Sequence, residues 1–348
     1  MAYISFQPSD YFNTKLYTGT GSSNAITGVG FQPDWLWIKD RDSGSNSNVI
    51  TDAIRGTNKI IFSDSSGAEL TDATRVTSFD SDGFTVGTSG STNTNTNDYV
   101  AWNWKANGSG SANTDGSISS TVSANTTAGF SIASFTSPAS GNFTFGHGLG
   151  VAPNVVILKT TGATSSWSFF HSTVCDTVRK YLTLETTNAL TTNGSDLWGA
   201  SLPTSSVMGA TSGQACVGSQ SCIAYCFAEK KGFSKFGSYT GNGSTDGTFI
   251  YTGFRPAFFM WKASSTTGGW YTIDNKRSDY NPSDKLLGAN DSSAESAFGY
   301  NYDHDFLSNG IKTRYGSFDM NQSGVTYIYM AFAEHPLVSS NDIPAVAR

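Results

Sequence analysis

One phrase occurs three times in the sequence: a glycine, a proline shortly after it, and an apolar run that closes on a lysine. The copies read GFQPDWLWIK (30–39), GVAPNVVILK (150–159) and GFRPAFFMWK (253–262). Turn residues followed by a short continuous apolar run indicate a turn that leads into a strand. A strand with no polar alternation is typical of one that is buried on both faces.

The segments that follow each copy keep the same order. An Asp-x-x-Arg pair comes first, then a strand-like apolar piece, and finally an aromatic-rich strand: YVAWNWK (99–105), CIAYCFA (222–228) and YIYMAFA (327–333). The spans Pro33 to Trp104, Pro153 to Phe227 and Pro256 to Phe332 are nearly equal in length. We therefore interpret the chain as three diverged copies of a unit of about 100 residues, longer than the roughly 20–50 residues of solenoid repeats.

The repeated unit is predicted to be all-β. Asp82-Gly83 and Asn309-Gly310 between apolar positions are strong hairpin signals, and no long segment has a helical period. Several short strands per unit indicate antiparallel β-sandwiches of jelly-roll type. The expected organisation is an N-terminal attachment arm (1–16), a first β-domain (17–106), a linker rich in Gly, Ser, Thr and Asn (107–129), a second β-domain (130–234), a third (235–338) and a tail (339–348). Within the linker, SISSTV could add an edge strand.

The charge pattern bears on possible partners. Charged residues make up only 14% of the chain, and the formal net charge is −6 with a pI near 5.1. Nucleic-acid binding through phosphates needs clustered Lys and Arg, which the sequence lacks. The start has no signal-peptide pattern, and the longest apolar stretch is too short to span a bilayer. We expect a soluble protein that binds no nucleic acid and inserts into no membrane.

The four cysteines are Cys175, Cys216, Cys222 and Cys226. We expect them to be buried as small apolar residues; a disulfide from Cys175 to one of the others is the alternative. Cys222 and Cys226 cannot bridge each other, because four strand residues separate them by about 13 Å. Together with His171 the cysteines suit zinc by residue type but not by spacing.

Other catalytic and metal signals are weak. Asp80 and Asp82 resemble the start of a calcium loop, but the further ligands are missing, so a turn explains them better. The sequence contains no G-x-S-x-G elbow, Walker A loop or H-E-x-x-H helix. Paired carboxylates for glycoside cleavage cannot be located by spacing. We expect no cofactor, no metal and no enzymatic activity.

Two groups of residues stand out as candidate sites. The Asp-x-x-Arg pairs recur in all three units, and we interpret them as structural ion pairs, with a ligand-binding pair as the alternative: Asp52 with Arg55, Asp176 with Arg179, and Asp274 with Arg277. On this interpretation, loss of Asp176 destabilises the middle domain. The second group consists of aromatic residues expected in loops, which could stack on a glycan or contact a partner if they are not in the core: Trp167, Trp198, Trp270 and Tyr271.

Several segments resemble phrases that recur in virion-associated proteins of marine tailed bacteriophages, notably cyanophages. They are MAYISFQPSDYFNTKLYTG, GFQPDWLWIKDR, TSFDSDGFTVG, YVAWNWKA, NTDGSISSTVSANTTAGFSI, GHGLGVAP and YIYMAFAEHPL. The resemblance covers nearly the whole chain and implies a structural or appendage role in the particle. It carries no catalytic motif. The middle unit departs most from the pattern, because NVVILK lacks the aromatic residues.

The leading hypothesis is a non-enzymatic virion protein on a surface appendage of tail-fibre or spike type, with possible contact to a host-surface glycan. The alternatives are a capsid decoration or head-fibre protein, a glycan-cleaving tail spike, and a secreted lectin. Phe6, Tyr11 and Phe12 lie outside the repeat and are expected to attach the chain to other virion proteins. A homotrimer in which three chains bury the neutral faces of their sandwiches is the first expectation for assembly.

Overall fold

The regular structure of the computed structural model is almost entirely strand, as the sequence predicts. The structure describes residues 7–278, 280–295, 302–316 and 319–336. Helix is short in these ranges, and the two named helical elements are the 3₁₀ turn η1 (Pro8–Asp10) and α1 (Gly90–Asn93). No helix in the described part of the chain has the length and hydropathy needed to cross a membrane.

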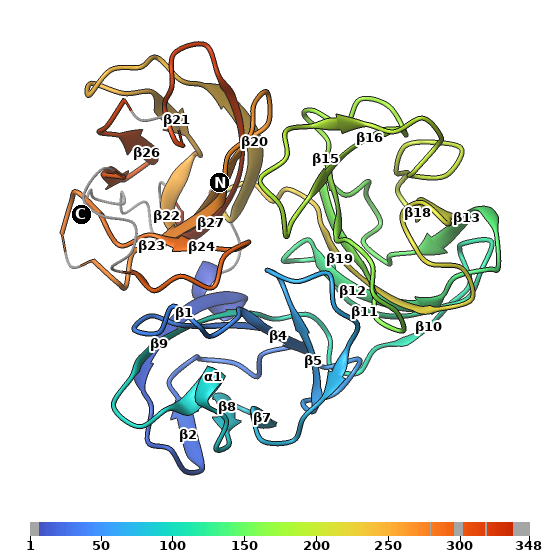
Figure 1. Ribbon diagram of the computed structural model, residues 1–348, viewed down its shortest axis with the longest axis horizontal. Helices are drawn as coiled ribbons and strands as arrows, with labels where there is room; N and C mark the ends of the chain where they lie inside the picture. The colour runs from blue at the N-terminus through green and yellow to red at the C-terminus, as the bar shows by residue number, and fades with distance from the viewer. Residues whose placement is uncertain (1–6, 279, 296–301, 317–318, 337–348) are drawn as a thin grey trace.

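Three units of the chain, 7–106, 107–228 and 229–336, form three lobes around a common centre (Figure 1). Each unit contains a main antiparallel sheet and a smaller sheet. In the first unit the main sheet has the order β1-β9-β3-β4-β5-β6 and the small sheet the order β2-β8-β7. The strands are β1 (Phe12–Thr18), β2 (Asn24–Thr27), β3 (Trp35–Asp40), β4 (Val49–Asp52), β5 (Lys59–Phe62), β6 (Leu70–Thr71), β7 (Val76–Asp80), β8 (Gly83–Val86) and β9 (Asp98–Trp104).

The second unit has a main sheet of order β10-β11-β12-β19-β14-β15-β16-β17 and a small sheet of β13 and β18. Its strands are β10 (Ser111–Asn113), β11 (Ser120–Asn125), β12 (Phe130–Thr136), β13 (Gly141–Gly146), β14 (Val155–Thr160), β15 (Ser168–His171), β16 (Lys180–Thr183), β17 (Thr191–Thr192), β18 (Val207–Ser212) and β19 (Ser221–Phe227). The linker prediction for 107–129 is therefore wrong. Its polar composition fits an edge hairpin, because β10 and β11 extend the main sheet, and only the suggested edge strand is confirmed.

The third unit has a main sheet of order β20-β27-β22-β23-β24 and a small sheet of order β21-β26-β25. Its strands are β20 (Ser234–Thr240), β21 (Phe249–Tyr251), β22 (Phe254–Ala263), β23 (Trp270–Asp274), β24 (Leu287–Gly288), β25 (His304–Leu307), β26 (Gly310–Thr313) and β27 (Thr326–Pro336). The predicted turns before Gly83 and Gly310 join β7 to β8 and β25 to β26. Asp82 accepts hydrogen bonds from the backbone N–H groups of Gly28 and Gly30, which is a turn role.

The repeated phrases occupy the same place in each main sheet. β3, β14 and β22 pair with the closing strands β9, β19 and β27 in one common register: Trp35 lies opposite Trp104, Val155 opposite Phe227, and Phe258 opposite Phe332. Every residue of β3 and of β14 is buried. The sequence prediction of strands buried on both faces is confirmed.

Two kinds of core account for this double burial. Leu36 and Ile38 face a core between the sheets of the first unit, whereas Trp35 and Trp37 face a core that all three units share. We call the shared cluster the central core. Its aromatic members are Phe12, Trp35, Trp37, Trp102, Trp104, Phe130, Trp167, Phe169, Tyr225, Phe227, Phe233, Phe236, Phe258, Trp270 and Phe332. Three sheet faces, one from each unit, therefore pack together within one chain.

The N-terminal attachment prediction is corrected by the same core. Phe12 begins β1, is only 2% exposed, and stacks on Phe332 of the third unit with ring centroids 5.2 Å apart. Tyr11 packs edge-on against Phe233. These rings find their apolar partners inside the molecule and do not form an external arm; Phe6 lies outside the described residues.

The central core predicts cooperative unfolding. Phe332 contacts rings from all three units, including Phe12, Phe227 and Phe258. Phe332→Ala should therefore lower the free energy of unfolding by about 3–5 kcal/mol and shift one common calorimetric transition. Leu70→Ala, at a side chain that is 47% exposed, should leave the transition almost unchanged. Separate transitions, with only one moved by Phe332→Ala, would contradict a shared core.

Candidate functional site

The polar residues that the sequence singles out lie mainly where one unit meets the next. In each unit, the loop that follows the third strand of the repeat (β5, β16 or β24) forms hydrogen bonds with the neighbouring unit. We call these loops the junction loops: 62–69, 183–190 and 288–295. The first is held by the second unit, the second by the third unit, and the third by the first unit. The three junctions therefore close a ring within one chain.

Backbone hydrogen bonds repeat at each junction. The last residue of each junction loop donates its backbone N–H to a carbonyl of the next unit. This carbonyl lies two residues after the lysine that ends the repeated phrase, which we call the repeat lysine. The pairs are Glu69 to Thr161 at 2.9 Å, Leu190 to Ser264 at 2.8 Å and Glu295 to Arg41 at 2.8 Å. Because this bond needs no particular side chain, it persists while the sequences of the units diverge.

Side-chain donors reinforce the same loops from equivalent positions. Opposite each repeat lysine in the sheet lies a residue whose side chain donates a hydrogen bond to the first carbonyl of a junction loop. The pairs are Asn48 to Gly288 at 3.1 Å, Trp167 to Phe62 at 3.0 Å and Trp270 to Thr183 at 2.9 Å. A tryptophan here places its ring in the central core and its N–H on a buried carbonyl, which satisfies both parts of the side chain.

The repeat lysines Lys39, Lys159 and Lys262 are fully buried. Each ammonium donates to carbonyl oxygens of its own unit and to one in the neighbouring junction loop: Ser292 at 2.9 Å, Ser66 at 2.9 Å and Thr187 at 3.0 Å, respectively. Among the described residues, none of the three lysines forms an ion pair. Burial lowers the pKa of each to about 8.

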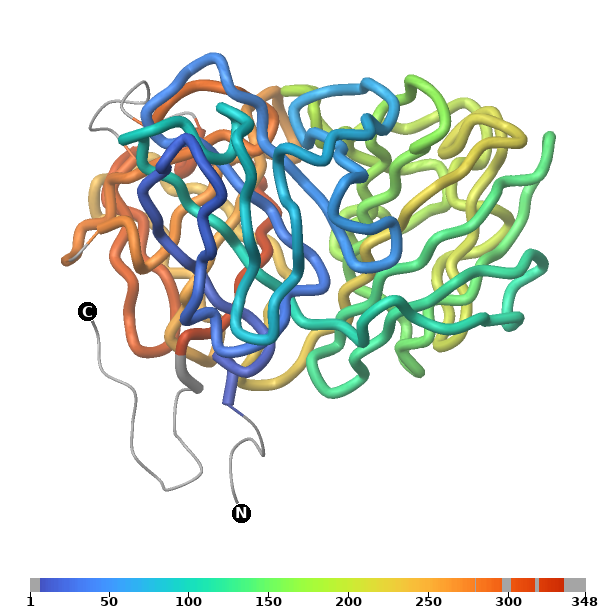
Figure 2. Tube along the Cα trace, turned by 90° about the horizontal axis from the view of Figure 1, so that it is seen from below, coloured from blue at the N-terminus to red at the C-terminus, as the bar shows by residue number. Residues whose placement is uncertain are grey.

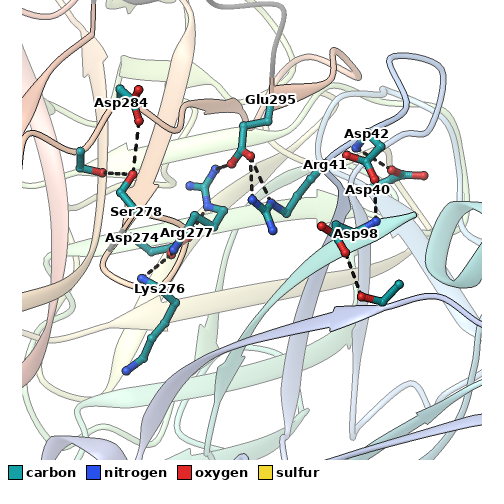
Figure 3. Close-up of polar contacts among 12 residues, drawn as sticks. Asp40, Arg41, Asp42, Asp98, Asp274, Lys276, Arg277, Ser278, Asp284 and Glu295 are labelled. Atoms are coloured by element: carbon teal, nitrogen blue, oxygen red, sulfur yellow. Dashed lines mark hydrogen bonds and ion pairs between the residues drawn. The ribbon is translucent and has the colours of Figure 1, made fainter. Parts of the chain in front are cut away.

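Two of the three predicted ion pairs are confirmed. Arg55 Nε lies 2.6 Å from Asp52 Oδ2, and Arg277 Nε lies 2.6 Å from Asp274 Oδ2. Each arginine also pairs with the last residue of its junction loop, Glu69 at 3.2 Å or Glu295 at 3.0 Å. The other aspartate oxygen accepts the backbone N–H of the arginine in each pair. The result is an Asp-Arg-Glu triad at the end of β4 and of β23. Figure 3 shows the triad of Asp274, Arg277 and Glu295.

Each triad also reaches into the next unit. The Tyr225 hydroxyl of the second unit donates to Asp52 at 2.8 Å, and the indole N–H of Trp102 of the first unit donates to Asp274 at 3.1 Å. Tyr225 and Trp102 occupy equivalent places in their closing strands. Burial raises the pKa of Tyr225 well above its usual value, so this hydroxyl remains a donor.

The third predicted pair is wrong. Asp176 bonds Lys180 at 2.8 Å, Arg179 bonds Asp196 at 2.9 Å, and these side chains lie at the surface. Strand register shows why: the residue of the second unit that corresponds to Asp52 and Asp274 is His171, opposite Val155. The Asp-x-x-Arg pattern recurs by chance a few residues later.

The second unit replaces the whole triad with neutral residues. His171 stands for the aspartate, Val174 for the arginine and Leu190 for the glutamate. His171 is fully buried, its Nε2 lies 3.2 Å from the Tyr329 carbonyl oxygen of the third unit, and burial lowers its pKa to about 4. The junction contact is therefore kept while the charges are removed together.

The aromatic residues proposed for glycan or partner contact are mostly internal. Trp167, Trp198 and Trp270 are at most 1% exposed, because two of them belong to the central core and Trp198 packs in the core of the second unit. Tyr271 is half-buried between the rings of Trp261 and Tyr302. The contact predictions for the three tryptophans are corrected, and the one for Tyr271 stays a prediction.

Clefts lie beside two junctions at equivalent positions. One of about 200 Å³ is bordered by Arg55, Lys59 and Glu69, and one of about 280 Å³ by Val174, Lys180 and Leu190. At the third junction Arg41 reaches Glu295 at 2.8 Å, next to Asp98 (Figure 3). The charged groups around these clefts are engaged with one another, so the junctions are built for cohesion.

The remaining predicted chemistry concerns the cysteines and metals. All four cysteines are free and buried, as expected. Among the described residues, no group of three or more His, Cys, Asp or Glu side chains is arranged to hold a metal ion.

The comparisons with known proteins give one match. A family model described as a domain of unknown function (DUF7483) matches residues 7–336. Comparison with curated proteins and with solved structures finds no match.

The internal repeats predict how a triad can be replaced. Asp52→Ala should cost about 3–5 kcal/mol, because it leaves a buried guanidinium without its main partner. The triple change Asp52→His, Arg55→Val and Glu69→Leu copies the second unit and should cost less than this single change. Asp176→Ala, at the surface, should stay within about 0.5 kcal/mol of the wild type. Chemical denaturation measures all three; a triple variant less stable than Asp52→Ala would contradict the equivalence.

The buried lysines predict a pH dependence of stability. Between the folded pKa of about 8 and the unfolded value of about 10.4, the unfolded chain binds more protons at Lys262. The contribution of Lys262 to the free energy of unfolding should therefore rise with pH across this window, and its full penalty should be present below pH 8.

Lys262→Met removes this dependence. The stability of the wild type relative to the variant should increase from about pH 7.5 to 9.5, below the range in which buried tyrosines titrate. The partly exposed Lys276→Met provides the control and should give a flat difference. A flat difference for Lys262→Met as well would refute the prediction.

Proposed function

The chain belongs to the family of the domain of unknown function DUF7483, and we propose that it is a non-enzymatic structural protein of a bacteriophage virion. In this proposal it is part of a surface appendage of tail-fibre or spike type. Its three units serve as tandem β-sandwich domains, each made of a main sheet and a small sheet. The resemblance of its repeated phrases to those of virion-associated proteins supports a role in the phage particle.

The observation that carries the proposal is the closed ring of junctions. Each junction loop is held by a backbone N–H, by a tryptophan or asparagine side chain and by a buried lysine of the next unit. A ring closed within one chain gives a stiff body whose shape does not depend on protein concentration. Such a body suits a part that must bear load on a particle and hold its outer surface in fixed geometry.

The use of charged residues also supports a structural role. The buried carboxylates Asp52 and Asp274 each accept hydrogen bonds from an arginine and from a neighbouring unit. A general acid or base must instead keep a proton-transfer position open to substrate. These residues stabilise the fold and are fully engaged in doing so.

Attachment would use one face of the molecule. The first described helix, η1, packs against β27, so both ends of the described chain emerge on the same side (Figure 2). Other virion proteins could bind there and leave the outer surfaces of the units free. The homotrimer expected from the sequence stays a prediction, and its contacts would involve these outer surfaces.

Particle analysis tests the proposal. Purified particles of a phage that encodes this chain should contain it in stoichiometric amounts on immunoblots, and gold-labelled antibodies against it should decorate the tail or a spike. Particles lacking the chain would refute a virion role. Labelling spread over the capsid would refute the appendage and favour head decoration.

A further inference from the structure

The exposed aromatic side chains among the described residues are concentrated in the third unit. In the first two units the large exposed apolar residues are aliphatic: Leu70, Val151 and Leu202. In the third unit they are aromatic: Phe249, Tyr251, Tyr280 and Tyr315. A difference between copies of one repeat points to a role that the fold itself does not require.

Phe249 and Tyr251 form a pair on the outside of the small sheet of the third unit. They lie on one face of β21 and are 43% and 56% exposed, while Ile250 between them points into the core and is 3% exposed. In a strand, side chains two residues apart project about 7 Å from each other on the same face. The two rings therefore form an aromatic platform, a name we use for Phe249 and Tyr251 together.

The other units lack this platform. Tyr251 lies opposite Gly310, Thr27 opposite Gly83, and Gly146 opposite Val207. This strand register makes Tyr251, Thr27 and Gly146 equivalent positions. Phe249 then corresponds to Ala25 and Thr144. The inward residues stay apolar in all three units: Ile26, Phe145 and Ile250 are all buried. The outward pair is small and exposed in the first unit and aromatic in the third, whereas in the second unit Gly146 is buried against Asn113.

The local structure holds the Phe249 ring in place. A Cβ at Gly310 would lie 2.9 Å from Cε2 of Phe249, so the Phe249 ring lies against this glycine. Lys312, opposite Phe249 in the sheet, pairs with Asp246 at 2.8 Å. A ring held on a rigid strand loses little conformational freedom when a ligand binds, which favours affinity.

A polar cleft adjoins the platform. It has a volume of about 220 Å³, and its lining includes Tyr251, Thr252, Ser234, Glu229, Lys231 and Lys235. Glu229 and Lys235 form an ion pair at 2.7 Å, so the charges of this pair balance, as do those of Lys312 and Asp246. Flat apolar ring faces beside a small cleft of hydrogen-bonding groups combine the two elements of a small-ligand site.

We propose that the aromatic platform and this cleft bind a neutral saccharide chain built of hexose rings. The apolar C–H face of a hexose stacks on an aromatic ring, and its hydroxyl groups bond to the polar groups of the cleft. A protein partner fits less well, because standard interfaces bury about 800 Å² on each side and this platform is bordered by ion pairs. The hydroxyl groups of a neutral chain can bond to the carboxylate, ammonium and hydroxyl groups of the cleft alike, whereas the carboxylates of an acidic chain would be repelled by Glu229.

The inference deepens the proposed function and rests on it only for the source of the saccharide, a bacterial surface. Binding by the purified protein and its location on a particle are measured separately. Failure of one experiment therefore does not decide the other.

The test is titration calorimetry of the full chain with three neutral probes: tetrasaccharides of β-linked glucose, of mannose and of galactose. At least one should bind, and a tetramer of galacturonate should bind at least tenfold more weakly. Phe249→Ala and Tyr251→Thr introduce the residues that the first unit carries, so both variants should fold with an unchanged melting temperature. Each should lower affinity at least tenfold, and the double variant should abolish binding.

Tyr280→Ala is the matched control, since Tyr280 is an aromatic residue of the same unit that is 80% exposed and lies outside the platform. It should bind like the wild type. The proposal is overturned if no neutral probe binds at millimolar concentration, or if the double variant binds as well as the wild type. Light scattering that shows self-association removed by Phe249→Ala would assign the platform to a second copy of the chain and would also overturn it.

Discussion

Burial of both faces of the main sheets is the constraint on which the rest of the structure depends. Alternate residues of one strand, such as Trp35 and Leu36, pack in different cores, so the middle strands of the main sheets have no face left for water. An antiparallel sheet usually leaves one face solvated. Here each main sheet packs one face within its own unit and the other face at a centre shared by all three units. The loops around this centre must therefore fit one another, and the junction hydrogen bonds join them.

Polar groups brought into such a centre must find partners, because an unpaired buried group is costly. At the junctions the chain meets this demand in two ways at equivalent positions. Units one and three use an Asp-Arg-Glu triad, whereas unit two uses His171, Val174 and Leu190. Replacing a buried ionic cluster as a set is tolerable, while removing one member is not. Within one chain, the repeats therefore show a charged triad in two units and its replacement as a set by neutral residues in the other.

Much of this fold could be predicted from sequence, because short-range signals determine it. Apolar runs, Asp-Gly turns and repeat order gave the strands, the unit count and two ion pairs. The rest depends on long-range register. The spacing of Asp176 and Arg179 imitates the triad, and only the pairing of His171 with Val155 reveals the true equivalent. Exposure of Trp167 or Phe12 could not be judged either, because a core shared by three units leaves no signal within any one of them.

Triplication also separates what the fold needs from what it does not. Positions such as Lys39, Lys159 and Lys262 keep one residue type and one set of contacts in every unit, which identifies them as part of the ring. A residue that serves the fold is expected to be restrained in each copy by the same packing. The outward positions of β2 and β21 are exposed and carry no such restraint. Aromatic residues at these positions of the third unit expose apolar surface to water and add nothing to its core. A ligand that covers them would remove this surface from water.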